Sequence, residues 1–168
     1  MSPKKILIVD DEAPVRKFLI DVFISEGFSV LEASSGEDAL KKIKLKLVDV
    51  IIMDLRMPGL DGLETLKEIS RMNLQAKIII MTGYATVKTA VDAMKLGAFD
   101  YIVKPFENDE LVEIVKSALA AGKSKANYRT ALEDDNSGII GRSPVMEDIF
   151  KQIKKVAPTN TTILITGE

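Results

Sequence analysis

The sequence predicts an α/β domain in which helices cover both faces of a single, doubly wound parallel sheet. Short runs of aliphatic residues, typical of strands buried on both faces, alternate with longer amphipathic stretches between residues 5 and 119. Five such strand and helix patterns follow one another, which favours a parallel sheet with right-handed crossover connections. The strands are expected at residues 5–9, 29–33, 48–54, 77–81 and 99–103.

The helical stretches carry local signals at their ends. Pro14 suits the first turn of the first helix, and Gly27 suits the position just after its last turn. Ser34 or Ser35 can cap the second helix, whose apolar stripe is expected to end at Leu47. Helices are expected at residues 13–25, 37–46, 62–72, 86–95 and from 107 to about 119.

Composition indicates an ordinary globular protein with one domain and part of another. The chain has 168 residues, of which 46% are hydrophobic and 29% charged, so one full core and a further fragment can be built. With a formal net charge of −2, the chain shows no excess of basic residues that would indicate nucleic-acid binding. The N-terminal apolar run is too short for a signal peptide, and no later run approaches the length of a membrane span. We therefore expect no membrane partner.

The chain contains neither cysteine nor histidine. This excludes disulfides, thiolate or imidazole metal ligands, and any catalysis by a histidine of this chain. The lack of cysteine fits the reducing cytoplasm, where we expect the protein to be found. A metal site here would have oxygen ligands, and Mg²⁺ is the ion that we expect.

Polar residues stand where four of the predicted strands end. Asp10 and Asp11 follow the first strand, Asp54 ends the third, Thr82 follows the fourth, and Lys104 follows the fifth. The strand order 2-1-3-4-5 makes strands one, three, four and five successive neighbours. Their carboxyl ends then line one crevice, which is where open α/β sheets bind ligands. We therefore predict a flavodoxin-like fold with these five residues around a single site.

Three carboxylates at one sheet edge favour chemistry assisted by a cation. Carboxylates this close repel one another, and a divalent ion such as Mg²⁺ relieves the repulsion. Asp54 can then attack a phosphoryl group while Mg²⁺ and Lys104 neutralise the phosphoryl oxygens, and Thr82 offers its hydroxyl to one of them. Taken singly, each residue also suits an ordinary role in a turn, a cap or the surface. The placement of all of them at strand ends favours a site.

Four short motifs surround these residues. They are IVDDE at 8–12, IIMDLRMP at 51–58, MTG at 81–83 and VKPF at 103–106. Together they resemble the receiver domain of bacterial two-component response regulators, over about the first 120 residues. The resemblance implies that Asp54 accepts a phosphoryl group from a phosphohistidine on a sensor histidine kinase. The donor must be another molecule, because this chain has no histidine.

The resemblance also implies a ligand set for Mg²⁺. Asp11, Asp54 and the backbone carbonyl of Arg56 would hold the ion, and Asp10 would act mostly through water. Lys104 would pair with the phosphoryl group.

A switch between two states is a further implication of the resemblance. Thr82 would swing toward the phosphoryl group, and Tyr101, at the aromatic switch position, would fill the space that Thr82 leaves. This movement would remodel the surface formed by the fourth helix, the fifth strand and the fifth helix. By residue type alone, Tyr101 is an amphipathic aromatic at a sheet edge.

The remaining residues predict a linker and the start of a second domain, after a receiver domain at 3–122. Residues 123–137 fit a solvated linker or a short dimeric coiled coil. Residues 138–168 resemble the opening of the AAA+ ATPase domain of sigma-54-dependent activators of the NtrC type. The phosphate-binding loop of that family would begin at Gly167-Glu168, but its Lys and Ser/Thr are missing, so we expect no ATP site in this truncated chain.

The same resemblance implies partners and a regulatory role. We expect a homodimer formed through the receiver and the linker helix. The longer protein would act with sigma-54 RNA polymerase and DNA through domains missing here. The chain would be a switch rather than a turnover enzyme, although it would assist its own phosphorylation and dephosphorylation.

Three other functions fit parts of the pattern. An aspartate-nucleophile phosphatase uses a second acid two residues after the nucleophile, where this chain has Arg56. A flavin or nucleotide binder needs a glycine- or hydroxyl-rich phosphate loop after the first strand, where Asp10-Asp11-Glu12 would repel phosphate. An interaction module that is never phosphorylated would share the fold.

Overall fold

A five-stranded parallel sheet organises the part of the chain that the computed structural model describes, residues 3–72 and 74–121. These residues belong to one compact unit, Met1–Lys123. The order across the sheet is the predicted, flavodoxin-like one. The strands, in this order, are β2 (Ser29–Ala33), β1 (Lys5–Val9), β3 (Val50–Asp54), β4 (Lys77–Thr82) and β5 (Asp100–Val103).

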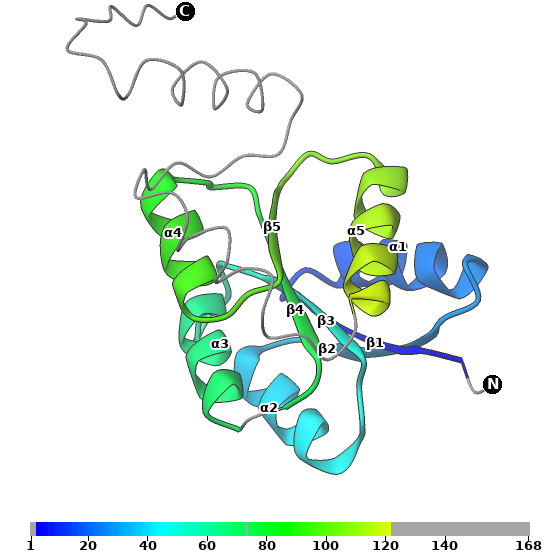
Figure 1. Cartoon of the computed structure of the whole chain (residues 1–168), viewed down its shortest axis with the longest axis horizontal. Coiled ribbons are helices and arrows are strands. Elements are labelled where there is room, and N and C mark those ends of the chain that lie inside the picture. The colour runs from blue at the N-terminus through cyan, green and yellow to red at the C-terminus, as the bar shows by residue number, and fades with distance from the viewer. Residues whose placement is uncertain (1–2, 73, 122–168) are drawn as a thin grey trace, which may run out of the picture. The chain divides into compact units, whose positions relative to one another are not determined.

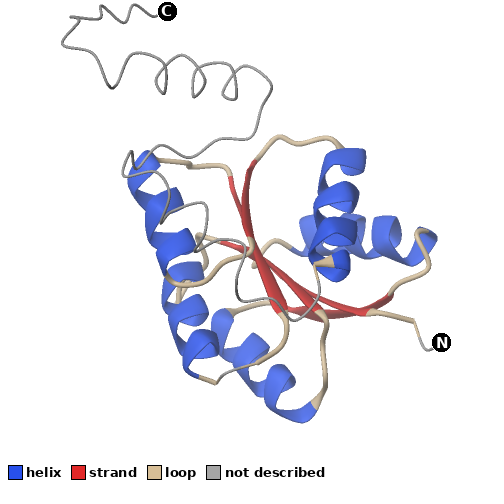
Figure 2. Cartoon of the chain, viewed as in Figure 1, coloured by secondary structure: helices blue, strands red, loops and turns tan. Residues whose placement is uncertain are grey.

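Helices cover both faces of this sheet, as Figures 1 and 2 show. One face carries α1 (Ala13–Ser25) and α5 (Asn108–Ala120), and the other carries α2 (Gly36–Leu45), α3 (Gly62–Arg71) and α4 (Val87–Lys95). The chain crosses from one face to the other between α1 and α2 and again between α4 and α5. This is the doubly wound arrangement that the alternating sequence pattern predicts.

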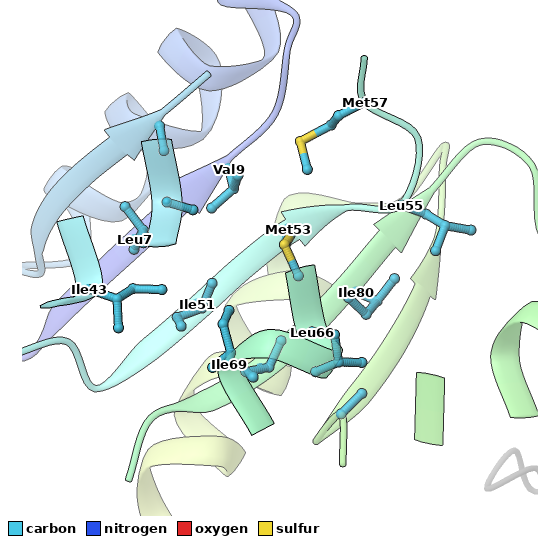
Figure 3. Close-up of a cluster of buried hydrophobic side chains, with 14 of the residues drawn as sticks. Leu7, Val9, Ile43, Ile51, Met53, Leu55, Met57, Leu66, Ile69 and Ile80 are labelled. Atoms are coloured by element: carbon cyan, nitrogen blue, oxygen red, sulfur yellow. The ribbon is translucent and has the colours of Figure 1, made fainter. Parts of the chain in front are cut away.

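The core divides into two clusters, one on each face, because successive strand side chains point to opposite sides. Leu7, Ile51 and Ile80 pack beneath α2 and α3 with Leu66 and Ile69 (Figure 3). The second cluster, under α1 and α5, contains Ile6, Ile8, Phe23, Ile52, Ile79 and Val115. The three inner strands, β1, β3 and β4, are thus buried on both faces, which fixes their register and the position of the residues that follow them.

The element boundaries agree with the sequence expectations to within two residues. Ser35 rather than Ser34 caps α2, because its side chain accepts a hydrogen bond from the Asp38 amide at 3.2 Å. The prediction for Leu47 is wrong: this residue lies beyond the end of α2 and is 89% exposed. Lys46 takes an extended conformation, with φ −136°, which turns the chain away from the helical path before Leu47.

Several predictions concern residues that lie outside the described part of the chain. These are the linker at 123–137 and the ATPase fragment at 138–168. Of the helices at 3–72 and 74–121, none is long and apolar enough to cross a membrane.

Gly62 starts α3 in close contact with the end of β3. A Cβ atom here would lie 2.5 Å from the Asp54 carbonyl oxygen and 2.8 Å from the Leu55 Cα. Both are backbone atoms, so neither can move aside by a side-chain rotation. We expect Gly62→Ala to lower the free energy of unfolding by about 1–3 kcal/mol, as overpacked cores do.

Urea unfolding measures this effect, with Gly83→Ala as the control. A Cβ atom at Gly83 would meet nothing within 4 Å, so a change within about 0.5 kcal/mol is expected there. Equal stability of the two variants would contradict the close approach of α3 to β3.

Candidate functional site

Two acidic residues are buried at the carboxyl edge of the sheet. Asp54 is the last residue of β3 and is 7% exposed, and Asp10, directly after β1, is 1% exposed. β1 and β3 pair in register, with Val9 opposite Met53, so the two strands end at the same level of the sheet. Burying two carboxylates side by side is unfavourable unless a cation and hydrogen-bond donors compensate them.

Lys104 supplies the cation. It follows β5, and its Nζ donates to Asp54 Oδ1 at 2.7 Å and to Asp10 Oδ2 at 2.9 Å. The Lys104 backbone N–H donates to the Thr82 carbonyl oxygen at 2.7 Å, which ties the residue to the end of β4. One ammonium group therefore bridges both buried carboxylates.

Backbone amides hold the other two carboxylate oxygens. The Glu12 N–H donates to Asp10 Oδ1 at 2.8 Å, and the Arg56 N–H donates to Asp54 Oδ2 at 2.7 Å. Both bonds reach back two residues, in turns that begin where the strands end. All four oxygens of the acid pair are thus hydrogen-bonded, which fixes the direction of each carboxylate.

Burial and pairing shift the pKa values of Asp54 and Lys104 in opposite directions. Burial raises the pKa of Asp54 above its ordinary value, while Lys104 and the Arg56 amide offset part of that rise. Burial alone would lower the pKa of Lys104, but its bonds to Asp54 and Asp10 outweigh burial and raise that pKa. Lys104 therefore stays protonated at neutral pH.

Thr82 and Tyr101 have hydrogen bonds of their own, away from the acid pair. Thr82 is fully buried at the end of β4, and its Oγ1 accepts a hydrogen bond from the Tyr84 N–H at 3.1 Å. The Tyr101 hydroxyl lies 3.0 Å from Thr89 Oγ1, which joins β5 to α4. Thr82 thus bonds its own loop, and Tyr101 bonds α4.

Asp11 and Arg56 lie on the loops around the acid pair. Asp11 is exposed, and within residues 3–72 and 74–121 its carboxylate makes no hydrogen bond or ion pair. Besides its amide bond to Asp54, Arg56 places its guanidinium over the Tyr84 ring, 4.4 Å from the centroid. The predicted site residues thus differ in their surroundings, with Asp10, Asp54 and Lys104 in direct contact.

Sequence reasoning missed two side chains that hold the loops of this site. Arg16 donates to the backbone carbonyls of Asp10 and Asp11, at 2.9 and 3.1 Å. Glu37 accepts a hydrogen bond from the Leu60 N–H at 3.0 Å, in the loop after β3. Their partners are backbone groups, which leave no trace in the sequence pattern.

The donor chemistry of the acid pair fits a hard cation such as Mg²⁺. Asp10 and Asp54 present carboxylate oxygens to one positive charge, and oxygen is the ligand atom that Mg²⁺ prefers. Within the described residues, no group of three or more His, Cys, Asp or Glu residues is close enough together to hold a metal. A full ligand set would therefore need Asp11 to turn inward or backbone carbonyls and water to contribute.

Known proteins match the chain over the region that builds this site. A family model described as "Response regulator receiver domain" matches residues 6–116. The regulatory protein AtoC of Escherichia coli is 41% identical over an alignment of 169 positions, which covers 98% of this chain and 37% of AtoC. The transcriptional regulatory protein ZraR of Salmonella typhimurium is 39% identical over 163 residues, with 97% and 37% covered. The chain thus spans little more than a third of the length of these relatives.

A solved structure agrees with these matches. The crystal structure of response regulator protein TrrA from Thermotoga maritima, in complex with Mg²⁺-BeF, aligns with a TM-score of 0.64. The two chains are 40% identical, and the alignment covers 69% of this chain and 99% of the other.

The raised pKa of Asp54 has a consequence for stability. A carboxyl group whose pKa is raised by folding favours the folded state when protonated, and this contribution is lost as pH rises through the folded-state pKa. At pH 7 the ionised Asp54 therefore lowers stability. We expect Asp54→Asn to raise the free energy of unfolding at pH 7 by about 1 kcal/mol.

Urea unfolding at pH 7 and at pH 3 checks this prediction. The gain from Asp54→Asn should shrink at the lower pH, because Asp54 itself is then protonated. A loss of stability in Asp54→Asn at pH 7 would show that pairing with Lys104 outweighs burial.

Proposed function

We propose that this chain, which belongs to the response regulator receiver domain family, is a phosphorylation-dependent switch whose phosphoacceptor is Asp54. The observation that supports this most directly is the contact of one Lys104 ammonium with both Asp54 and Asp10, at 2.7 and 2.9 Å. A carboxylate nucleophile with a fixed cation beside it suits transfer of a phosphoryl group to an aspartate.

The chemistry assigned to Asp54 is a direct transfer. One carboxylate oxygen forms a bond to phosphorus as the phosphorus–nitrogen bond of the donor's phosphohistidine breaks, and the released imidazole takes up a proton. The Arg56 amide and Lys104 hold the Asp54 carboxylate so that it does not rotate freely before attack. Lys104 then remains beside the acyl phosphate and neutralises part of its charge.

Mg²⁺, which Asp10, Asp11, Asp54 and the Arg56 carbonyl would hold, supplies further positive charge to the phosphoryl oxygens when it is bound. Because Lys104 contacts both buried acids, a second cation at this edge would share them with the ammonium group. Asp11, which is exposed and makes no side-chain hydrogen bond or ion pair within residues 3–72 and 74–121, is free to join.

We assign the structural change that follows phosphorylation to Thr82 and Tyr101. Rotation of the Thr82 hydroxyl toward the phosphoryl group would break its bond to the Tyr84 amide. Inward movement of Tyr101 would break its bond to Thr89 and release α4 from β5. One added phosphoryl group would thus change two hydrogen bonds at the α4–β5 surface.

The family and the relatives support a set of proposed partners. A sensor histidine kinase is the proposed phosphodonor. The matched relatives are named as regulatory proteins, which supports a role in transcription through parts that this chain does not contain. For the longer protein we propose a homodimer formed through the receiver and linker, acting with sigma-54 RNA polymerase and DNA. The receiver itself assists its own phosphorylation and dephosphorylation and converts no other substrate.

Intact mass measurement after incubation with acetyl phosphate tests the phosphoacceptor. We expect one phosphoryl adduct that requires Mg²⁺ and is absent from Asp54→Asn. Asp21→Asn, an exposed aspartate on α1, is the matched control and should be phosphorylated like the unmodified chain. An adduct that persists in Asp54→Asn, or no adduct on the folded unmodified chain, would contradict the proposal.

A further inference from the structure

We propose that Arg16 is a positioning residue for the cation site, because it holds the backbone of Asp10 and Asp11 and so sets the affinity of their carboxylates for Mg²⁺. This inference rests on the proposed function in taking Mg²⁺ as the ion. It concerns a side chain that touches neither the ion nor the phosphoryl group.

The Arg16 side chain forms a clamp between α1 and the loop after β1. Nη1 of Arg16 donates to the Asp10 carbonyl oxygen at 2.9 Å and to the Asp11 carbonyl oxygen at 3.1 Å. Nε of the same guanidinium donates to Glu32 Oε2, on β2, at 2.9 Å. Although it is charged, the Arg16 side chain is only 14% exposed. A planar, rigid group thus connects three elements around the loop that carries both acids.

The two acids depend on this clamp to different degrees. The Asp10 carboxylate is also held by Lys104 and the Glu12 amide. Within residues 3–72 and 74–121, the Asp11 carboxylate makes no hydrogen bond, so only its backbone determines where it stands. Arg16 is the side chain that bonds this backbone. The position of Asp11 should therefore change most when Arg16 is replaced.

The positive charge of Arg16 and its hold on the loop of Asp10 and Asp11 have opposite effects on the affinity for Mg²⁺. A guanidinium near the site repels Mg²⁺, so its removal would strengthen binding if charge dominated. Glu32 pairs with this guanidinium at 2.9 Å and offsets part of that repulsion. Because Glu32 offsets part of this charge, we expect the hold of Arg16 on the loop to dominate. Loss of its planar guanidinium should therefore weaken Mg²⁺ binding. Groups that orient metal ligands from outside the first coordination shell typically contribute about 10-fold or more to affinity.

Arg16→Lys separates the two effects, because it keeps the charge but loses the planar fork. Mg²⁺ titration of the whole chain, followed by amide chemical shifts, gives the dissociation constant without any phosphorylation. We expect Arg16→Lys to bind Mg²⁺ about 10-fold more weakly than the unmodified chain. Lys17→Gln, at the next and exposed position on α1, removes a charge without touching the loop and should bind like the unmodified chain.

Hydrogen exchange without Mg²⁺ checks whether the loop itself becomes less ordered when Arg16 is replaced. The Glu12 N–H donates to Asp10 within the clamped loop, so its hydrogen exchange should become faster in Arg16→Lys. Glu32→Ala, which removes the other anchor of the guanidinium, should show both effects to a smaller extent. If Arg16→Lys does not fold, faster exchange of the Glu12 N–H in Glu32→Ala serves as the test, because weaker Mg²⁺ binding by that variant is also expected from its lost negative charge.

The outcomes separate this inference from the proposed function. Equal Mg²⁺ affinity in Arg16→Lys and the unmodified chain would overturn the role of Arg16 and leave the phosphoacceptor site intact. Stronger binding in Lys17→Gln together with unweakened binding in Arg16→Lys would show that charge rather than position controls affinity, and would also overturn it. Absence of Mg²⁺ binding by the unmodified chain would overturn the metal site of the proposed function, and the role of Arg16 with it.

Discussion

The site of this protein depends on one ammonium group placed between two buried carboxylates. Lys104 reaches Asp54 and Asp10 from the end of β5, while the acids come from β3 and β1. Removing carboxylates from water costs several kcal/mol for each ion unless a partner compensates. The contact between these three residues therefore joins three strands through their functional groups as well as through the sheet. Under the proposed function, it is also the contact that a bound cation or phosphoryl group would modify.

The surrounding architecture brings the backbone close enough for this arrangement to persist. Gly62 allows α3 to approach the main chain at Asp54, and the Arg56 amide returns to the Asp54 carboxylate. On the other side of the sheet edge, Arg16 holds the loop that carries Asp10. Each acid is thus oriented by the turn that follows it and by a neighbouring helix. Such pre-organisation favours function, and the raised pKa of Asp54 indicates that it is achieved at the expense of some stability.

Much of the fold and the centre of the site could be predicted from sequence because both follow from strand patterns. Residues 5–9 and 50–54 are apolar runs that end at Asp10 and Asp54, so the positions of the acids follow once strand order is assumed. The expectation for Leu47 failed because helical spacing does not show where a helix ends. Lys46 is already extended, but the helical spacing of apolar residues continues to Leu47, so the sequence does not show where the helix ends.

The remaining features could not be predicted because their partners are backbone atoms or distant side chains. Arg16 on α1 has the spacing of an ordinary surface arginine, yet it bonds two carbonyl oxygens. The contact of Tyr101 with Thr89 depends on how α4 packs against β5, which no local pattern specifies. In these cases the contacts of the side chain are set by tertiary packing.

The central claim is that Lys104 compensates the two buried acids and that a divalent cation can share this role. Urea unfolding of Lys104→Met, with and without Mg²⁺, tests it most directly. Without Mg²⁺ we expect a loss of about 1–3 kcal/mol, because two buried acceptors lose a charged donor. Mg²⁺ should then restore more stability to Lys104→Met than it adds to the unmodified chain.

Lys116→Met, which removes an exposed ion pair with Glu26, is the control and should change stability by less than about 1 kcal/mol. Unchanged stability of Lys104→Met, together with no effect of Mg²⁺ on either protein, would contradict the claim.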